Sequence, residues 1–421
     1  MKRFLFCLAF LGFLAGSFKA AAVPGPIAAA PAATLLLPYF EADLGDPNNK
    51  GITTLFSINN ATAESQLAHV TVWSTWSIPL LDFDVYLTGF DVQTFDIRDI
   101  LTSGILPQTG FGTTDATNNP GSPRGPYSYR KVNFPNCSAT ATPPAPPVYS
   151  TPAISAAFRS HLQALLTGRR SPVDNTCAGT NYGDDIARGY VTVDDVNSCS
   201  LLFPSSTGYF ISGGLGIASN DNVLWGDYVY VDPGNNYAHA ETLVHIKADD
   251  TILNTPGEYT FYGRYVAGTA ADNREPLPTS FATRYVAASF GSTHLIVWRD
   301  SKYPPGASCT FGPNFGTLTA SQVVAFDEAE NVQFDCRGCD LFPDETQRIE
   351  IDNLNPFGWI YLNLNHSTPL DKGYGPGYAC IAQAWVETGM DSQGWFSVGY
   401  DAIQLDNANT AVPCGIFLDP L

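Results

Sequence analysis

The stretch Trp359-Ile360-Tyr361-Leu362-Asn363-Leu364 decides the fold class of this chain. Ile360, Leu362 and Leu364 fall on one face of an extended backbone, and the residues between them fall on the other, which is the alternation of a half-buried β-strand. A shift in register of one residue would expose the apolar face. The stretch therefore predicts a strand in a sheet that packs one face on a core.

Similar runs rich in β-branched and aromatic residues occur along most of the chain, separated by Pro, Gly, Asn and Asp. Long helical periodicities are scarce. The strands that we expect cover residues 52–59, 67–73, 83–87, 228–231, 259–266, 295–298, 349–351, 359–364 and 395–400. We therefore predict an all-β protein with an antiparallel β-sandwich architecture, built as one or two sandwiches.

Residues 154–166 break the strand pattern. Apolar side chains recur there at helical spacing, with Thr151 as a candidate cap and Gly168 just past the end. The helix lies in a stretch, 110–188, that also contains the Pro-rich run Thr142-Pro143-Pro144-Ala145-Pro146-Pro147. We predict that 110–188 is an insertion between strands. Basic residues outnumber acidic ones in it, so it either packs against the acidic body of the protein or binds an anionic ligand.

The first 22 residues have the features of an export signal. Lys2 and Arg3 precede an apolar run, 4–14, and Ala20-Ala21-Ala22 supplies a cleavage site. No later apolar stretch is long enough for a membrane-spanning helix. We expect export to the periplasm, the cell surface or the medium, with no transmembrane segment in the mature chain.

The length of the mature chain suggests a β-sandwich domain over 23–300 and a second sandwich, or a continuation of the first, over 301–421.

The chain carries a formal net charge of −19, and loss of the signal makes it more negative. Nucleic acid and anionic lipid are therefore excluded as main partners. Eight of the nine cysteines follow the signal, and an oxidising compartment favours four structural disulfides among them. Cys380 with Cys414 is the pair that spacing favours, and a redox or zinc role for the C-x-x-C pair is the alternative. The eight are Cys137, Cys177, Cys199, Cys309, Cys336, Cys339, Cys380 and Cys414.

Histidines and acidic turn residues are the candidate metal ligands of this chain. His239, Glu241 and His245 fall on one face of an extended strand, but the two histidines would be roughly 20 Å apart, so a solvated strand face explains them better than a metal site. Asp46, Asn48, Asp221 and Asp232 lie in turns and are candidate calcium ligands. None completes a calcium-loop pattern, and turn chemistry explains the same residues. We expect no cofactor, with calcium as the open possibility.

No nucleophile, zinc-protease, phosphate-binding or dinucleotide motif is present, and no residue can be assigned as catalytic. Asp82 and Asp84 share a strand face at the spacing of neighbours, which chance explains equally well. Aromatic residues near turns, such as Trp73, Trp76 and Trp225, could stack on sugar rings or anchor a protein partner, although most tryptophans should be buried.

The run Leu35-Leu36-Leu37-Pro38-Tyr39-Phe40-Glu41, with Ile296-Val297-Trp298-Arg299 later in the chain, resembles exported bacterial β-rich proteins of no assigned function. The resemblance implies export and no particular activity. We expect a disulfide-stapled binding or structural protein outside the cytoplasm rather than an enzyme, with a glycan or a cell-surface protein as its partner. A secreted glycan hydrolase that uses carboxylates as acid and base is the alternative.

Overall fold

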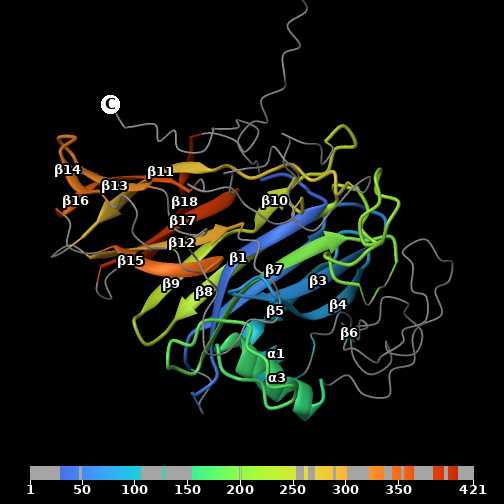
Figure 1. Cartoon of the computed structure of the whole chain (residues 1–421). Coiled ribbons are helices and arrows are strands. Elements are labelled where there is room, and N and C mark those ends of the chain that lie inside the picture. The colour runs from blue at the N-terminus through green and yellow to red at the C-terminus, as the bar shows by residue number, and fades with distance from the viewer. Residues whose placement is uncertain are drawn as a thin grey trace, which may run out of the picture.

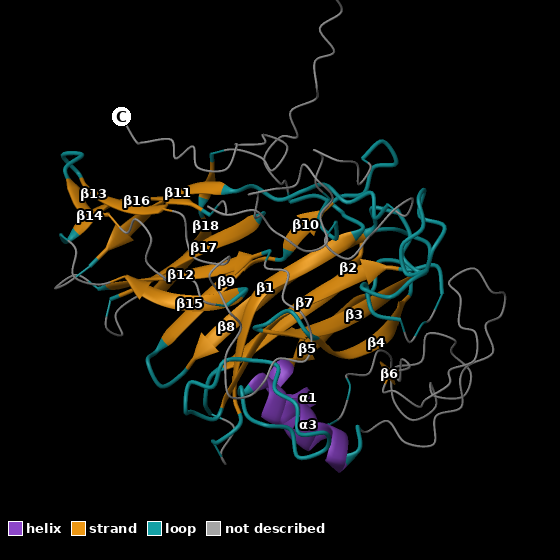
Figure 2. Ribbon diagram, viewed as in Figure 1, coloured by secondary structure: helices purple, strands orange, loops and turns teal. Residues whose placement is uncertain are grey.

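The structure is a computed structural model, and its elements are drawn in Figures 1 and 2. It describes residues 29–46, 50–104, 106, 127–128, 154–198, 200, 202–252, 260–263, 271–287, 291–300, 322–335, 344–351, 355–364, 383–392 and 397–405. Within them the chain is all-β, with four antiparallel sheets and two helices, as the sequence predicts. No helix in these ranges is long and apolar enough to cross a membrane.

Two of the sheets form the first pair and take their strands from the earlier part of the chain. The first sheet has the order β10 (Val244–Ile246), β1 (Thr34–Asp43), β7 (Ile186–Asp195), β3 (Gln66–Ser74), β4 (Pro79–Leu87) and β6 (Tyr127–Ser128). The second has the order β5 (Val92–Asp96), β2 (Thr53–Asn60), β8 (Leu224–Asp232) and β9 (Tyr237–Thr242). Leu35, Val70 and Val193 of the first sheet pack against Phe56 and Tyr228 of the second in one apolar core.

The other two sheets form the second pair, coloured yellow to red in Figure 1. The third sheet has the order β14 (Val332–Asp335), β13 (Gln322–Asp327), β16 (Phe357–Asn363), β11 (Ser280–Val286) and β19 (Ile403–Gln404). The fourth has the order β15 (Thr346–Ile351), β12 (Ser292–Arg299), β17 (Ala384–Asp391) and β18 (Ser397–Asp401). Ile360, Leu362 and Leu364 are fully buried in the core of this pair, so the predicted face of 359–364 is confirmed.

A third apolar core joins the two pairs. The outer face of the first sheet contributes Trp73 and Tyr190, and the fourth sheet contributes Trp298 and Trp385. Trp73 and Tyr190 are stacked with ring centroids 5.6 Å apart. The first sheet is therefore buried on both faces. β11 and β12 precede residue 300 but pair with strands that follow it. The division into domains at residue 300 stays a prediction.

The predicted helix is confirmed as α3 (Ala156–Leu166), with Gly168 in the left-handed region at φ 69° just beyond it. Its cap is Ser155, whose hydroxyl accepts from the backbone N–H of Phe158, so the expectation of Thr151 as the cap was wrong. A second helix, α1 (Ile97–Ser103), was not predicted. Residues 260–263 form a turn, where a strand over 259–266 was expected.

The two pairs also meet where the edge strand β9 lies beside β18. Ala238 N donates to Ser397 Oγ at 3.1 Å, and the same hydroxyl donates to Ala238 O at 2.8 Å. Gly399 makes this approach possible, because a Cβ atom there would lie 2.1 Å from Nδ1 of the buried His239 ring. The second sheet is thus covered along one edge by the fourth.

Candidate functional site

Two adjacent cavities lie between the two pairs of sheets, and we call them together the polar cleft. The smaller, of about 240 Å³, is lined by Tyr39, Glu41, Tyr182, Arg188, His294, Thr346, Gln347, Arg348 and Glu350. The larger, of about 670 Å³, is lined by Asp232, Gly234, Asn235, Asn236, Tyr237, Ser292, His294, Arg348, Glu350 and Asp391. His294, Arg348 and Glu350 belong to both linings, so the two cavities share one wall made by β12 and β15.

Glu41 of β1 forms the base of the smaller cavity and is almost completely buried. Its carboxylate accepts from Tyr39 Oη at 2.7 Å, from Tyr230 Oη, and from Arg188 Nε at 3.2 Å. A nitrogen of Arg348 lies 3.4 Å from its second oxygen. Burial alone would raise the pKa of Glu41, but Arg348 and Arg188 hold it below the usual value. Glu41 is therefore a buried anion whose charge is fully compensated.

The two arginines reach Glu41 from different sheets. Arg188 lies on β7, directly opposite Glu41 in the register, and forms a second, bidentate ion pair with Asp184 through bonds of 2.8 and 2.7 Å. Arg348 lies on β15 of the fourth sheet, and its guanidinium lies 5.4 Å from the centre of the Tyr230 ring. Because Glu41 holds both cations, it fixes β15 against the first pair of sheets at the base of the cleft.

Ser292, His294 and Asp391 meet in the larger cavity and invite comparison with a serine-protease triad. Ser292 Oγ donates to Asp391 Oδ2 at 3.0 Å, and both atoms also approach Nε2 of His294, at 3.3 and 3.2 Å. In a triad the serine and the carboxylate bond to different ring nitrogens, so that the histidine can relay the serine proton. Here both share one nitrogen, and the serine proton is already directed to the carboxylate. The geometry therefore differs from that of a serine-protease triad.

The calcium candidates are distributed over separate turns. Asp232 lies at the end of β8 in the cleft lining, and its oxygens accept from the N–H and the side-chain amide of Asn235 at 3.2 and 2.7 Å. Asp46 accepts from Lys50 N, Asp221 is exposed, and Asn48 lies outside the described residues. In the part of the chain that the structure describes, no three His, Cys, Asp or Glu side chains are placed to hold a metal ion. The four residues stay candidates on sequence grounds only.

A second polar cluster is closed to solvent on the outer face of the first sheet. His69 of β3 places Nδ1 2.8 Å from Asp84 and Nε2 3.4 Å from Asp82, both on β4. Burial alone would lower the pKa of His69, but Asp84 and Asp82 raise it to about 10. The ring of Tyr209 covers the histidine at a centroid distance of 5.6 Å. Asp82 and Asp84, whose spacing in the sequence chance could explain, thus form a buried carboxylate–imidazolium–carboxylate group with His69.

Asp194 of β7 extends the same cluster. It lies opposite His69 in the register and accepts from Thr34, Tyr209 and Tyr262, at 2.5, 2.8 and 3.0 Å. Arg274, also fully buried, donates to the hydroxyl of Thr34 at 3.0 Å. None of these residues lines the polar cleft, and the cluster links β1, β3, β4 and β7 through buried polar contacts.

The expectation of a solvated strand face around His239 was wrong. His239 is buried on β9, where Nε2 lies 3.0 Å from Tyr228 Oη and 3.5 Å from Glu387. His245 lies on β10 in a different sheet, and burial lowers its pKa to about 4. Its ring packs on Trp225 with centroids 4.4 Å apart. The two histidines therefore belong to separate contacts and cannot share a metal ion with Glu241.

The described tryptophans are largely internal. Trp73, Trp76, Trp298 and Trp385 are buried, Trp225 and Trp359 are half-buried, and Trp395 lies outside the described residues. Cys177 is buried and disulfide-bonded. The other predicted disulfide cysteines lie outside the described residues, so the framework of four disulfides stays a prediction: Cys137, Cys199, Cys309, Cys336, Cys339, Cys380 and Cys414.

Comparison of the chain with models of protein families, with curated proteins and with solved structures finds no match.

Proposed function

We propose that the protein is an exported binding protein whose polar cleft takes a neutral, hydroxyl-rich ligand such as an oligosaccharide. The observation that carries the proposal is the composition of the cleft lining. It combines carboxylates, guanidinium groups, side-chain amides and hydroxyls, which are the groups that bind vicinal hydroxyls of sugars by paired donation and acceptance. The volume of the larger cavity lies in the range of small-ligand sites.

The charge of the lining supports a neutral ligand over an anionic one. Arg188 and Arg348 are the cationic side chains of the lining, and Glu41 lies between them as a compensated anion. Asp232, Glu350 and Asp391 add further negative charge in the larger cavity. An anionic ligand would therefore meet a field of the wrong sign. We also propose that the protein is exported and has four disulfides. Disulfides form in oxidising compartments, and they would stabilise the fold that holds the binding site.

The hydrolase alternative rests on the three carboxylates of the larger cavity, Asp232, Glu350 and Asp391. A glycosidase needs one carboxyl group whose pKa is raised so that it can act as the acid. Burial does raise the pKa of Asp195 to about 7 and of Asp272 and Asp344 to about 6, but these groups lie outside the cleft lining. Binding is therefore the better supported function, and release of reducing ends from an array ligand would support hydrolysis instead.

Glu350→Gln is expected to weaken binding of a neutral oligosaccharide about tenfold. The side chain is exposed and lines both cavities, so its charge-assisted hydrogen bonds to ligand hydroxyls are lost while the fold is kept. The mature protein is first screened on an array of neutral and acidic glycans, and the dissociation constant of the strongest neutral ligand is then measured by calorimetry.

Glu64→Gln is the matched control, because Glu64 is an exposed carboxylate in a turn that lines neither cavity. It should bind as the wild type does. An array on which only acidic glycans bind, or equal affinity of the Glu350→Gln and wild-type proteins for the neutral ligand, would contradict the proposal.

A further inference from the structure

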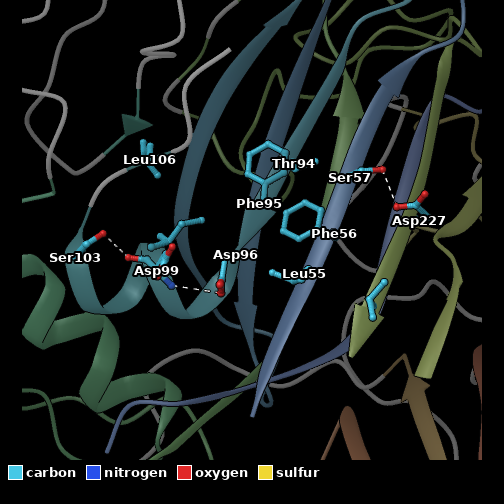
Figure 3. A pocket seen from close by; sticks show the side chains of 12 residues that line it. Leu55, Phe56, Ser57, Thr94, Phe95, Asp96, Asp99, Ser103, Leu106 and Asp227 are labelled. Carbon is cyan, nitrogen blue, oxygen red and sulfur yellow. Dashed lines mark hydrogen bonds between the residues drawn. The ribbon is translucent and has the colours of Figure 1, made fainter. Parts of the chain in front are cut away.

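A third cavity, of about 810 Å³, lies where β5 leads into α1, and its described lining offers a ligand no open aromatic surface. Phe56 and Phe95 are the aromatic residues of that lining, and Figure 3 shows them on neighbouring strands. They stack on each other with centroids 4.5 Å apart, and each is 3% exposed. Aromatic surface that a ligand can reach lies instead in the polar cleft, at Tyr182.

Tyr182 is an exposed tyrosine of the cleft lining. It lies in the segment between α3 and β7, at the wall of the smaller cavity. Tyr182 is 47% exposed, whereas Tyr39 and Tyr237, which line the same cleft, are 2% and 5% exposed. An open ring beside polar lining groups is a contact surface for an apolar part of a ligand.

The ring of Tyr182 is held in place by two contacts. Its hydroxyl donates to Oδ2 of the buried Asp344 at 2.7 Å. The Arg188 guanidinium lies 4.7 Å from the ring centre, and its ion pairs with Asp184 and Glu41 fix it there. Because the hydroxyl and one ring face are already occupied, the uncovered part of the side chain is ring carbon. A ligand can pack on it without first having to order the ring.

The smaller cavity has room for one ring-sized group. Its volume of about 240 Å³ is below the roughly 300–1,000 Å³ of sites for drug-sized ligands. The larger cavity continues from it along the wall that contains His294, Arg348 and Glu350. One residue of an oligosaccharide therefore fits beside Tyr182, while its neighbours extend into the larger cavity.

A pyranose ring has two kinds of surface that match these groups. Hydroxyls project from its rim and can bond to charged side chains such as Arg348 and Glu350. Its C–H groups form an apolar face, which loses contact with water when it packs on an aromatic ring. An open-chain polyol carries similar hydroxyls but lacks the rigid apolar face, and it loses more conformational entropy on binding.

We propose that Tyr182 is the surface on which one pyranose ring of the ligand stacks, so that the cleft binds cyclic sugars in preference to open-chain polyols. This inference rests on the proposed binding of a neutral oligosaccharide, and it adds a ligand class and a specificity-determining residue. The C–H face of the sugar packs on Tyr182, and its rim hydroxyls face Arg348 and Glu350.

Tyr182→Phe and Tyr182→Leu are the matched variants that test the stacking. Both lose the hydrogen bond to Asp344, but only phenylalanine keeps a flat ring. We expect Tyr182→Leu to weaken binding of the strongest neutral array ligand about tenfold or more, and Tyr182→Phe to weaken it at most about threefold. Calorimetry measures both affinities, and Glu64→Gln, which lies outside the cleft lining, should bind as the wild type does. The two Tyr182 variants should have similar thermal unfolding midpoints, because they lose the same bond.

A competition assay tests the ligand class. The bound array ligand is displaced by methyl pyranosides of its own sugars and, separately, by the alditols made from the same sugars. In the wild-type protein the pyranosides should displace it at concentrations about tenfold lower than the alditols, and Tyr182→Leu should remove this preference.

Equal affinities of the Tyr182→Phe and Tyr182→Leu proteins for the array ligand would overturn the stacking role of Tyr182, and so would equal displacement by pyranosides and alditols. Either result would leave the proposed binding of a neutral oligosaccharide standing. An array on which no neutral glycan binds would overturn both proposals.

Discussion

Glu41→Gln is expected to lower the free energy of unfolding by about 3–5 kcal/mol, the typical cost of removing one partner from a buried ion pair. The substitution keeps the shape of the side chain but removes the anion shared by Arg188 and Arg348. It also places an amide N–H₂ beside the hydroxyls of Tyr39 and Tyr230, which donate to the carboxylate in the native protein. Arg348 then has no described carboxylate partner.

Urea denaturation of the mature, oxidised protein at pH 7 measures this loss. Glu350→Gln is the matched control, because it makes the same change at an exposed position two residues from Arg348, where less than about 0.5 kcal/mol is expected. A loss below about 1 kcal/mol for Glu41→Gln would contradict the role of Glu41 as the group that holds β15 to the first pair of sheets.

The Glu41 contribution also has a defined pH dependence. The pKa of Glu41 is lowered in the folded protein, so its contribution is present above the pKa of a free glutamate, about 4.3, and is lost as the pH falls through the folded value. The difference in stability between the wild-type and Glu41→Gln proteins should therefore decrease in acid.

The His69 cluster is expected to make the protein less stable as the pH rises above neutrality. The pKa of His69 is raised to about 10, whereas that of a free histidine is about 6.5. Between these values the folded state holds a proton that the unfolded state has released. The contribution of His69 is therefore complete below pH 6.5 and decreases by up to about 1.4 kcal/mol per pH unit until it is lost near pH 10.

His69→Gln tests this by removing both the charge and its titration. Asp82 and Asp84 are then left as buried carboxylates without their cation, and we expect a loss of about 3–5 kcal/mol at pH 7. Urea denaturation between pH 7 and pH 9.5 should show a shallower decline for the variant than for the wild type, whereas Glu350→Gln should keep the wild-type slope. Parallel slopes for His69→Gln and wild type would show that the imidazolium is not the titrating group.

The all-β class was predictable because short runs rich in β-branched and aromatic residues are separated by turn residues, and several of these runs, such as 359–364, alternate apolar and polar residues. The same alternation misleads at His69, Asp82 and Asp84. Polar residues on one strand face normally indicate solvent, but here the third apolar core and the rings of Tyr209 and Tyr262 cover that face. Local pattern cannot reveal a second layer contributed by segments more than 100 residues away along the chain.

β1 and α1 were harder to predict for local reasons. β1 contains Pro38 at a register shift between Leu37 and Phe40, and a proline reads as a strand end unless the bulge is known. Thr346 of β15 donates its hydroxyl to Pro38 O, a contact that no local pattern contains. α1 spans only seven residues, too few to show a helical period, and its ends are set by the Asp96 cap and by Gly104 at φ 72°.

The polar cleft could not be found from the sequence. Its walls come from β1, β7, the turn between β8 and β9, β12, β15 and β17, which lie far apart along the chain and meet through the packing of three sheets, the first, the second and the fourth. Asp232 was noted as a turn residue, but its position beside Arg348, Glu350 and Asp391 depends on how the two pairs of sheets are joined. Site prediction here required the tertiary structure.

Hydrogen–deuterium exchange of the mature protein, with and without the strongest neutral oligosaccharide from the array, tests the central claim most directly. Ligand at saturation should slow exchange in peptides that cover β1, the turn between β8 and β9, β12 and β15, and it should leave α1 and β14 unchanged. Saturable binding with protection confined to α1 and β5, or with no protection in β12 and β15, would contradict a ligand site between the two pairs of sheets.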